Sequence, residues 1–344
     1  MKHLGANLAL LALALATASP RGFAQQTPCL DRMIAVNVTT LDGTPAKGLT
    51  AVNFRAKVRG GAADVVSATY DTGPRRVVFL LDTSASMFEG NTNKWRPTLL
   101  VAEDLVSTAP SQVSFALVTF ASKAENRVSF GQDRRALLDE LQKLEGISQR
   151  DIKGGHLTAL RDAMLEALSL LSPARTGDAI YVVTDTGENA SRRKESQVRP
   201  QFLWSGVRLF GFVPAAPTEP PLPSEPYDGL NLLDDLVAST GGDGIVLYPP
   251  SEGSADSRAG EKSFGTGGPF LPKSGVPPTV RDILLFASRG LGQEISEFYR
   301  VNIRLHEPVL GKPRDWKLEV IATATGKKIP HLRLVYPRKL APCP

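Results

Sequence analysis

The sequence predicts an α/β fold built on a doubly wound, mostly parallel sheet with helices on both faces. First, short apolar runs alternate with segments of helical period from Arg76 onward, a pattern typical of parallel strands joined by helices. Second, runs such as 77–81 are wholly apolar, as expected of strands that helices cover on both faces. Third, a β-rich segment lies on each side of this region, and each is too short to bury a core alone.

These patterns divide the chain into four parts. Residues 1–24 are discussed below, residues 25–74 hold β-type runs, residues 75–297 form the α/β domain, and residues 298–344 return to β-type runs. We expect the two terminal β segments to pair into one small additional β-sandwich, with the α/β domain inserted between them.

Turn signals and apolar periodicity place the individual elements. In the terminal β segments, strands are predicted over 33–39, 53–59, 63–70, 298–306, 316–323 and 332–336. In the α/β domain, strands are predicted over 77–81, 113–120, 127–130, 179–184, 207–213 and 244–248, and helices over 95–109, 133–144, 158–171, 230–239 and 279–297. Residues 215–226 and 249–278 are rich in Pro or in Gly, Ser and Pro, so we expect surface loops or partly disordered segments there.

The first 24 residues have the layout of a secretory signal peptide. Lys2 gives a positive start, an apolar run follows over 8–18, and the small residues Gly22 and Ala24 precede the expected cleavage site. The alternative interpretation is a buried first helix. The apolar run is too short for a stable membrane anchor, and no later segment approaches its length. We therefore expect an exported protein, periplasmic or secreted, with no transmembrane anchor after cleavage.

Charge and cysteine content narrow the possible partners. The formal net charge is +5, and the basic residues are scattered, with no basic helix, so we expect no nucleic-acid partner. The two cysteines, Cys29 and Cys343, lie near the two ends of the mature chain. In an exported protein such a pair predicts an intramolecular disulfide, the alternative being two unrelated thiols.

Side chains with oxygen atoms follow the first buried strand of the α/β domain. Asp82, Ser84 and Ser86 come directly after residues 77–81, at the edge of an open α/β sheet where ligands bind. One carboxylate and two hydroxyls at alternating positions can converge on one point. Such hard oxygen donors suit Mg²⁺, Mn²⁺ or Ca²⁺ better than zinc.

This arrangement resembles the metal-ion-dependent adhesion site of von Willebrand factor A domains and integrin inserted domains. Residues 154–163 resemble the family segment Gly-Gly-x-Thr-x-Leu-x-Asp-Ala, with one extra residue before the Thr, and this implies Thr158 as a metal ligand. Residues 180–188 resemble the family strand that ends in Thr-Asp-Gly, which implies Asp185 as the last carboxylate, with Thr186 at the usual glycine position. Residues 236–242 resemble the late Leu-Ala-x-x-Thr-Gly-Gly stretch.

The segments that flank this region resemble a narrower group. Residues 38–54 and 298–301 are similar to the corresponding segments of von Willebrand A-related proteins described from acidobacteria.

The resemblance implies an exported adhesion or assembly module that binds an Asp or Glu of a protein partner through a divalent cation, with Mg²⁺ as the first choice. Rim candidates are residues 87–93, His156 and residues 188–191. Taken singly, the proposed ligands also fit ordinary turn and helix-cap roles. A scaffold for envelope proteins that works without metal is therefore the alternative.

We do not expect an enzyme, and a hydrolase is the least favoured interpretation. An aspartyl phosphatase needs a second carboxylate where Ser84 stands. A serine hydrolase needs its Ser on a sharp turn between glycines, which neither Ser84 nor Ser86 has.

Overall fold

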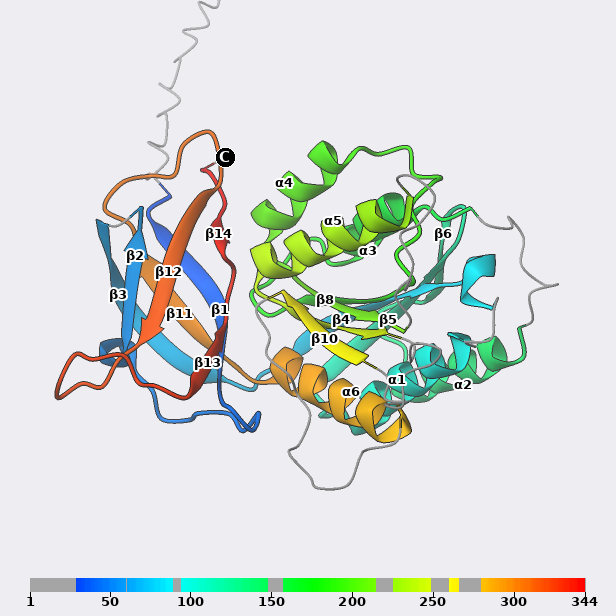
Figure 1. The fold of residues 1–344 in the computed structure, drawn as a ribbon, viewed down its shortest axis with the longest axis horizontal. Coiled ribbons are helices and arrows are strands. Elements are labelled where there is room, and N and C mark those ends of the chain that lie inside the picture. Colours follow the sequence, from blue (N-terminus) through cyan, green and yellow to red (C-terminus); the bar gives the residue numbers. More distant parts are fainter. Residues whose placement is uncertain are drawn as a thin grey trace, which may run out of the picture.

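The computed structural model describes two units that lie side by side (Figure 1). The predicted signal peptide, residues 1–24, lies outside the described residues. The structure describes residues 29–59, 61–88, 94–147, 157–214, 225–248, 260–265 and 280–343. We call the part from β4 to α6 the α/β unit, and the sheet formed by the strands before β4 and after α6 the β unit.

The α/β unit is built on a seven-stranded sheet with the order β10-β9-β8-β7-β4-β5-β6. Neighbouring strands from β9 through β5 are parallel, whereas β10 and β6 join the two edges antiparallel. The predicted mostly parallel sheet is therefore confirmed. The strands are β4 (Arg75–Asp82), β5 (Val113–Phe120), β6 (Ala124–Val128), β7 (Ala179–Val183), β8 (Arg208–Val213), β9 (Asp243–Tyr248) and β10 (Gly260–Gly265).

In the part of the chain that the structure describes, six α-helices cover the two faces of this sheet (Figure 1). On one face lie α1 (Trp95–Thr108), α2 (Arg134–Glu145) and α6 (Val280–Ser296), and on the other lie α3 (Leu160–Leu170), α4 (Glu195–Ser205) and α5 (Glu225–Thr240). Side chains of a strand alternate between faces, so Phe79 and Leu81 of β4 join the core under α1, while Val78 and Leu80 join the core under α3. Burial on both sides explains why this strand is apolar throughout.

Three elements differ from the sequence-based expectation. Residues 260–265, inside the expected loop 249–278, pair with β9 as strand β10. The expected strand over 127–130 is observed as β6, and the sequence pattern does not predict α4. Helix α4 carries Pro200 in its interior and buries only Val198 and Phe202, so its apolar period is weak.

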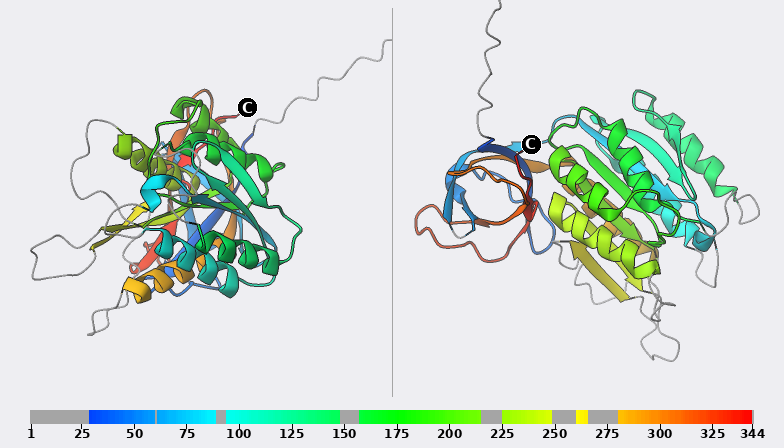
Figure 2. Two further views of the ribbon diagram at one scale, coloured as in Figure 1. Left: turned by 90° about the vertical axis from the view of Figure 1, so that its right-hand side faces the viewer. Right: turned by 90° about the horizontal axis from the view of Figure 1, so that it is seen from above.

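The terminal segments pair with each other, but they form one curled antiparallel sheet and not the expected β-sandwich (Figure 2). Strand β1 pairs with β11, and β2 pairs with β12. The order is β13-β1-β11-β3-β2-β12-β14, and a register shift at Asn302/Ile303 bends β11, which allows a single sheet to fold around its own apolar core. The strands are β1 (Asp31–Thr40), β2 (Phe54–Val58), β3 (Gly61–Asp71), β11 (Phe298–Arg304), β12 (Arg314–Val320), β13 (Leu332–Val335) and β14 (Lys339–Leu340).

The predicted disulfide is confirmed. Cys29, just before β1, is bonded to Cys343, just after β14, with 5.8 Å between their Cα atoms. The bond joins the first and last described segments of the β unit across 314 positions of sequence.

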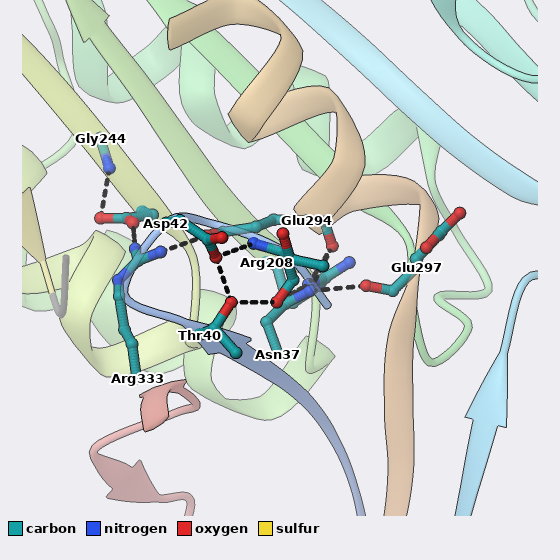
Figure 3. Close-up of polar contacts among 10 residues, drawn as sticks. Asn37, Thr40, Asp42, Arg208, Gly244, Glu294, Glu297 and Arg333 are labelled. Carbon is teal, nitrogen blue, oxygen red and sulfur yellow. Dashed lines mark hydrogen bonds and ion pairs between the residues drawn. The ribbon is translucent and has the colours of Figure 1, made fainter. Parts of the chain in front are cut away.

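A buried polar network fastens the β unit to the α/β unit (Figure 3). Arg208, at the start of β8, donates to the Asn37 side chain of β1 at 2.9 Å and to the carbonyl oxygens of Glu294 and Ile295 at 3.0 and 3.1 Å. Asn37 also donates to the Glu294 carbonyl at 2.9 Å. These donors satisfy the last carbonyls of α6, where the helix dipole also favours a positive charge. Arg333 of β13 then pairs with the Glu294 carboxylate at 2.7 Å.

Strand β4 starts at this junction and ends at the opposite edge of its sheet. Its first residue, Arg75, is buried, pairs with Asp71 of the β unit at 2.9 Å and lies over the Phe298 ring at 4.2 Å. Its last residue is Asp82.

Within the described residues, no helix has both the length and the apolar character needed to cross a membrane.

Candidate functional site

The site begins at the carboxyl end of β4, where the buried Asp82 accepts two hydrogen bonds. Its Oδ1 atom accepts from the Ser84 backbone N–H at 2.9 Å, and its Oδ2 atom accepts from the Thr184 hydroxyl at 2.6 Å. Ser84 is buried and Ser86 half-buried, and their hydroxyl oxygens lie 3.1 Å apart. A short 3-10 helix, η2 (Ala85–Met87), fixes this turn. The first three predicted ligands therefore lie together.

Asp185 follows the adjacent strand β7 and is 8 % exposed. Its Oδ2 atom accepts a hydrogen bond from the Lys94 ammonium at 2.7 Å. Its buried Oδ1 atom has no hydrogen-bond donor among the described residues. Because Thr184 bonds to Asp82, the ends of the two neighbouring strands are tied together at this point.

Thr158 comes from a third segment, directly before α3, and it is buried. Its backbone N–H donates to the Asn189 side chain at 2.8 Å, and its carbonyl accepts from the Asn189 backbone at 3.0 Å. A Cβ atom at Gly187 would lie 3.1 Å from the Thr158 hydroxyl oxygen and 3.7 Å from the Asp185 Oδ1 atom. The Thr158 hydroxyl and the orphaned Asp185 oxygen therefore border one small space, which the absence of a side chain at residue 187 leaves open.

The loop after β7 is held rigidly against the start of α3. The Glu188 carboxylate is buried and accepts from the Arg161 backbone N–H and the Ser191 hydroxyl, both at 2.8 Å. The Asp162 carboxylate accepts from the backbone N–H groups of Arg192 and Arg193 at 2.9 and 3.0 Å. This network of hydrogen bonds fixes the position of Thr158 relative to Asp185.

The expectation that residues 87–93 and 188–191 form the rim of the site is partly wrong. Glu188 is buried in support of α3, and Met87 is fully buried in the turn, so neither faces a partner. Residues 89–93 and His156 lie outside the described residues. Leu157, which precedes Thr158, is 47 % exposed and is an apolar rim residue that the motif does not indicate.

Thr186 occupies a backbone conformation that favours glycine. Its φ angle is 70°, a left-handed value that costs other residues about 1–2 kcal/mol. The Thr186 N–H donates to the Thr184 hydroxyl at 2.9 Å, which holds the turn. A Cβ atom at Gly229 of α5 would lie only 2.0 Å from the Thr186 carbonyl oxygen, so α5 packs directly on this turn. Packing thus maintains the loop although Thr stands at the family's glycine position.

The electrostatics of the site are unbalanced. Burial raises the pKa of Asp82 above its usual range, and the negative charge of Asp185 raises it further, against the hydrogen bonds from Thr184 and Ser84. The ammonium of Lys94 is the counter-charge that pairs with Asp185. Lys94 pairs with one of the two neighbouring carboxylates, so negative charge is in excess, and this is the environment that a cation stabilises.

The donor set fits a hard divalent cation. It combines carboxylate and hydroxyl oxygens, an orphaned carboxylate oxygen and a space kept open by glycine. Within the described ranges, no group of three or more His, Cys, Asp or Glu residues is placed to hold a metal ion, so such a site depends on its hydroxyls. Thr184, which holds the Asp82 carboxylate, is the Thr of the Thr-Asp-Gly segment, whereas the sequence motif does not indicate Lys94, which holds the Asp185 carboxylate.

Comparison with known families decides the nature of the α/β unit. Residues 77–188 match the family model of the von Willebrand factor type A domain. Residues 77–188 belong to a von Willebrand factor type A domain. The matched segment includes all five residues predicted to bind the metal. No curated protein matches the chain, and the similarity of the flanks to acidobacterial proteins stays a prediction.

Solved structures with similarity to the chain include two bacterial proteins and one protein of the mussel byssus. An aerotolerance-related membrane protein from Bacteroides fragilis is 20 % identical, covers 64 % of this chain and 86 % of its own, and has a TM-score of 0.34. The conserved hypothetical protein BatB from Bacteroides thetaiotaomicron is 17 % identical, with 64 % and 84 % covered and a TM-score of 0.35. Proximal thread matrix protein 1 from the mussel byssus, solved with zinc in its MIDAS motif, is 18 % identical, with 42 % and 38 % covered and a TM-score of 0.35. We rest the assignment on the family match alone.

Proposed function

We propose that the von Willebrand factor type A domain binds a divalent cation, Mg²⁺ before Mn²⁺ or Ca²⁺, and through it an acidic residue of a protein partner. The ligands are Asp82, Ser84, Ser86, Thr158 and Asp185. The observation that carries the proposal is the buried Asp185 Oδ1 atom, which has no donor among the described residues and borders the same glycine-lined space as the Thr158 hydroxyl. A buried polar atom of this kind needs a partner.

The charge of the site explains the partner's chemistry. A divalent cation supplies two positive charges next to two carboxylates and neutral hydroxyls, and it has a coordination position for a further oxygen. An Asp or Glu from a partner provides that oxygen with its negative charge, and contacts at the rim provide specificity. The exposed Leu157 supplies an apolar contact beside the site.

The protein acts as a binding module in an oxidising compartment. The disulfide between Cys29 and Cys343 is typical of exported proteins, and the first 24 residues fit a secretory signal. We therefore place the protein in the periplasm or outside the cell. The described part of the site combines carboxylate and hydroxyl oxygens suited to an ion, and we assign it to adhesion or assembly.

A melting experiment tests the metal. Saturating Mg²⁺ or Mn²⁺ should stabilise the protein relative to EDTA, by about 2.7 kcal/mol when the free ion exceeds the dissociation constant about a hundredfold. Asp185→Asn should abolish this gain. Asp315→Asn, at an exposed position of the β unit, is the matched control and should keep it. A parent protein whose melting temperature is the same in Mg²⁺, Mn²⁺ and EDTA would remove the metal from the proposal.

A second experiment tests the partner. An immobilised peptide with a single Glu or Asp should retain the protein in Mg²⁺ and release it in EDTA, whereas the matching Gln or Asn peptide should not retain it. Retention of both peptides regardless of EDTA would instead support the alternative function, a scaffold that uses its loops without metal.

A further inference from the structure

Lys94 is the one feature of the site that the metal-binding role leaves unexplained. Its ammonium lies 2.7 Å from the Asp185 Oδ2 atom, and its side chain is only 19 % exposed. The residue is not part of the family motif described above, and it comes from the segment directly before α1. A cation of the protein itself therefore occupies one side of a carboxylate that is proposed to bind a metal.

The position of Lys94 is fixed by the helix that it precedes. Its carbonyl accepts from the Thr98 hydroxyl at 2.9 Å and from the Thr98 backbone N–H at 3.2 Å. The next residue, Trp95, is buried, and its indole N–H donates to the Leu144 carbonyl at 3.1 Å. The backbone at Lys94 is thus anchored, and the flexible four-carbon stem alone carries the ammonium across to Asp185.

Charge makes the Lys94 ammonium and a divalent cation competitors for Asp185. The two positive groups repel at close range, and this repulsion is strong where burial reduces solvent screening. In the metal-free protein, on the other hand, Lys94 supplies the counter-charge that the buried Asp185 carboxylate requires. One side chain therefore favours the metal-free state and disfavours the metal-bound state.

We propose that Lys94 is a built-in competitor of the metal, which holds Asp185 in the metal-free domain and must leave it when a divalent cation binds. The proposal rests on the metal binding proposed above. The ion pair reduces the apparent metal affinity by the fraction of molecules in which it is broken, so a pair formed in about nine tenths of the molecules weakens binding about tenfold. Lys94 thus sets the cation concentration at which the domain becomes able to bind its partner.

Calorimetric titration with Mn²⁺ tests the affinity. Lys94→Gln should bind Mn²⁺ about tenfold more tightly than the parent, and in EDTA it should melt at a lower temperature. Lys143→Gln removes an exposed ion pair with Glu140 on α2 and should leave both quantities unchanged. Lys94→Gln combined with Asp185→Asn should not bind Mn²⁺, which shows that the gain uses the same site.

A chemical readout separates displacement from a general effect of charge. Lys94 should react slowly with an amine-acetylating reagent in EDTA and several-fold faster in saturating Mg²⁺, as measured by peptide mass spectrometry, while Lys143 should react equally in both. If the parent binds Mn²⁺ but Lys94→Gln binds it no more tightly, or if Mg²⁺ leaves the acetylation of Lys94 unchanged, the competitor role is wrong and the metal site stands. If neither protein binds Mn²⁺, the proposed function itself fails, and this inference fails with it.

Discussion

In the described part of the chain, a cluster of buried charged residues lies at each end of the sheet of the α/β unit, and these clusters differ in the balance of their charges. At the junction with the β unit, Arg208 and Arg333 face the carboxylates of Glu294 and Asp243, so that positive and negative groups are equal in number. At the opposite edge, within the described part of the chain, the Asp185 carboxylate pairs with the ammonium of Lys94, while the nearby Asp82 carboxylate is held by hydrogen bonds alone.

This difference separates a structural network from a binding site. The junction arginines donate to carbonyls and carboxylates that the fold itself supplies. Each cluster holds a carboxylate oxygen without a donor among the described residues, Glu294 Oε2 at the junction and Asp185 Oδ1 at the edge. Burial and an unsatisfied oxygen are therefore common to both clusters, and the excess of negative charge at the edge distinguishes them.

The largest expected effect comes from breaking the balanced cluster. Arg208→Met should lower the free energy of unfolding by about 3–5 kcal/mol, because it leaves the Ile295 carbonyl and the Asn37 side-chain oxygen buried without their donor, and the Glu294 carbonyl with Asn37 alone. Urea unfolding followed by tryptophan fluorescence measures the change. Arg289→Gln, which removes an ion pair between an exposed arginine of α6 and Asp104 of α1, is the control. A loss below about 1 kcal/mol for Arg208→Met would mean that the junction contributes little to stability.

Removal of the disulfide that closes the β unit should have the next largest effect on the free energy of unfolding. Cys29→Ser combined with Cys343→Ser should lower the free energy of unfolding by about 2–5 kcal/mol, because the long loop that the disulfide closes gains entropy in the unfolded chain. Reducing the parent protein with dithiothreitol should reproduce the loss and leave the double variant unaffected. If the reductant destabilises both proteins equally, the disulfide is not the cause.

Neutralising the unbalanced cluster should have the smallest effect and the opposite sign. In EDTA, Asp82→Asn should raise the free energy of unfolding by about 1 kcal/mol, because it removes one of two repelling buried charges. The amide oxygen can still accept from the Ser84 N–H, and the amide N–H can donate to the Thr184 hydroxyl oxygen in place of the present bond. In saturating Mg²⁺ the order should reverse, since only the parent gains from the metal. A variant that is less stable than the parent in both solutions would contradict the charge imbalance.

The parts of the fold that depend on local pattern can be predicted from the sequence. The wholly apolar run of β4 identifies a strand covered on both faces, and this pattern alone places Asp82 at a sheet edge. Strand β10 and helix α4 lack such patterns, so the sequence does not predict them. The expected β-sandwich has two stacked sheets. In the structure, both terminal segments contribute strands to one sheet, and a bulge in β11 lets that sheet curl on itself.

The candidate site is predictable only where a motif covers it. The resemblance assigns Thr158 and Asp185, and both lie beside Gly187 in the folded protein. Lys94 is not part of the motif. Its role depends on the position of α1, which brings the Lys94 side chain to Asp185 at the end of β7. The motif suggests a place at the rim for Glu188, but its burial depends on tertiary bonds to Arg161 and Ser191, which a sequence does not display.

The course of strand β4 also has a mechanical consequence. The strand runs from Arg75, which is held by the β unit, to Asp82 at the proposed partner site, and it is hydrogen-bonded along its length to β5 and β7. When a tethered partner pulls on the far edge while the β unit is held, the tension runs along this strand. The backbone hydrogen bonds that join β4 to β5 and β7 are then loaded in shear, so that many of them must break together rather than one after another. A domain that binds its proposed partner at Asp82 and is held by the β unit at Arg75 is thus suited to resist a pulling force.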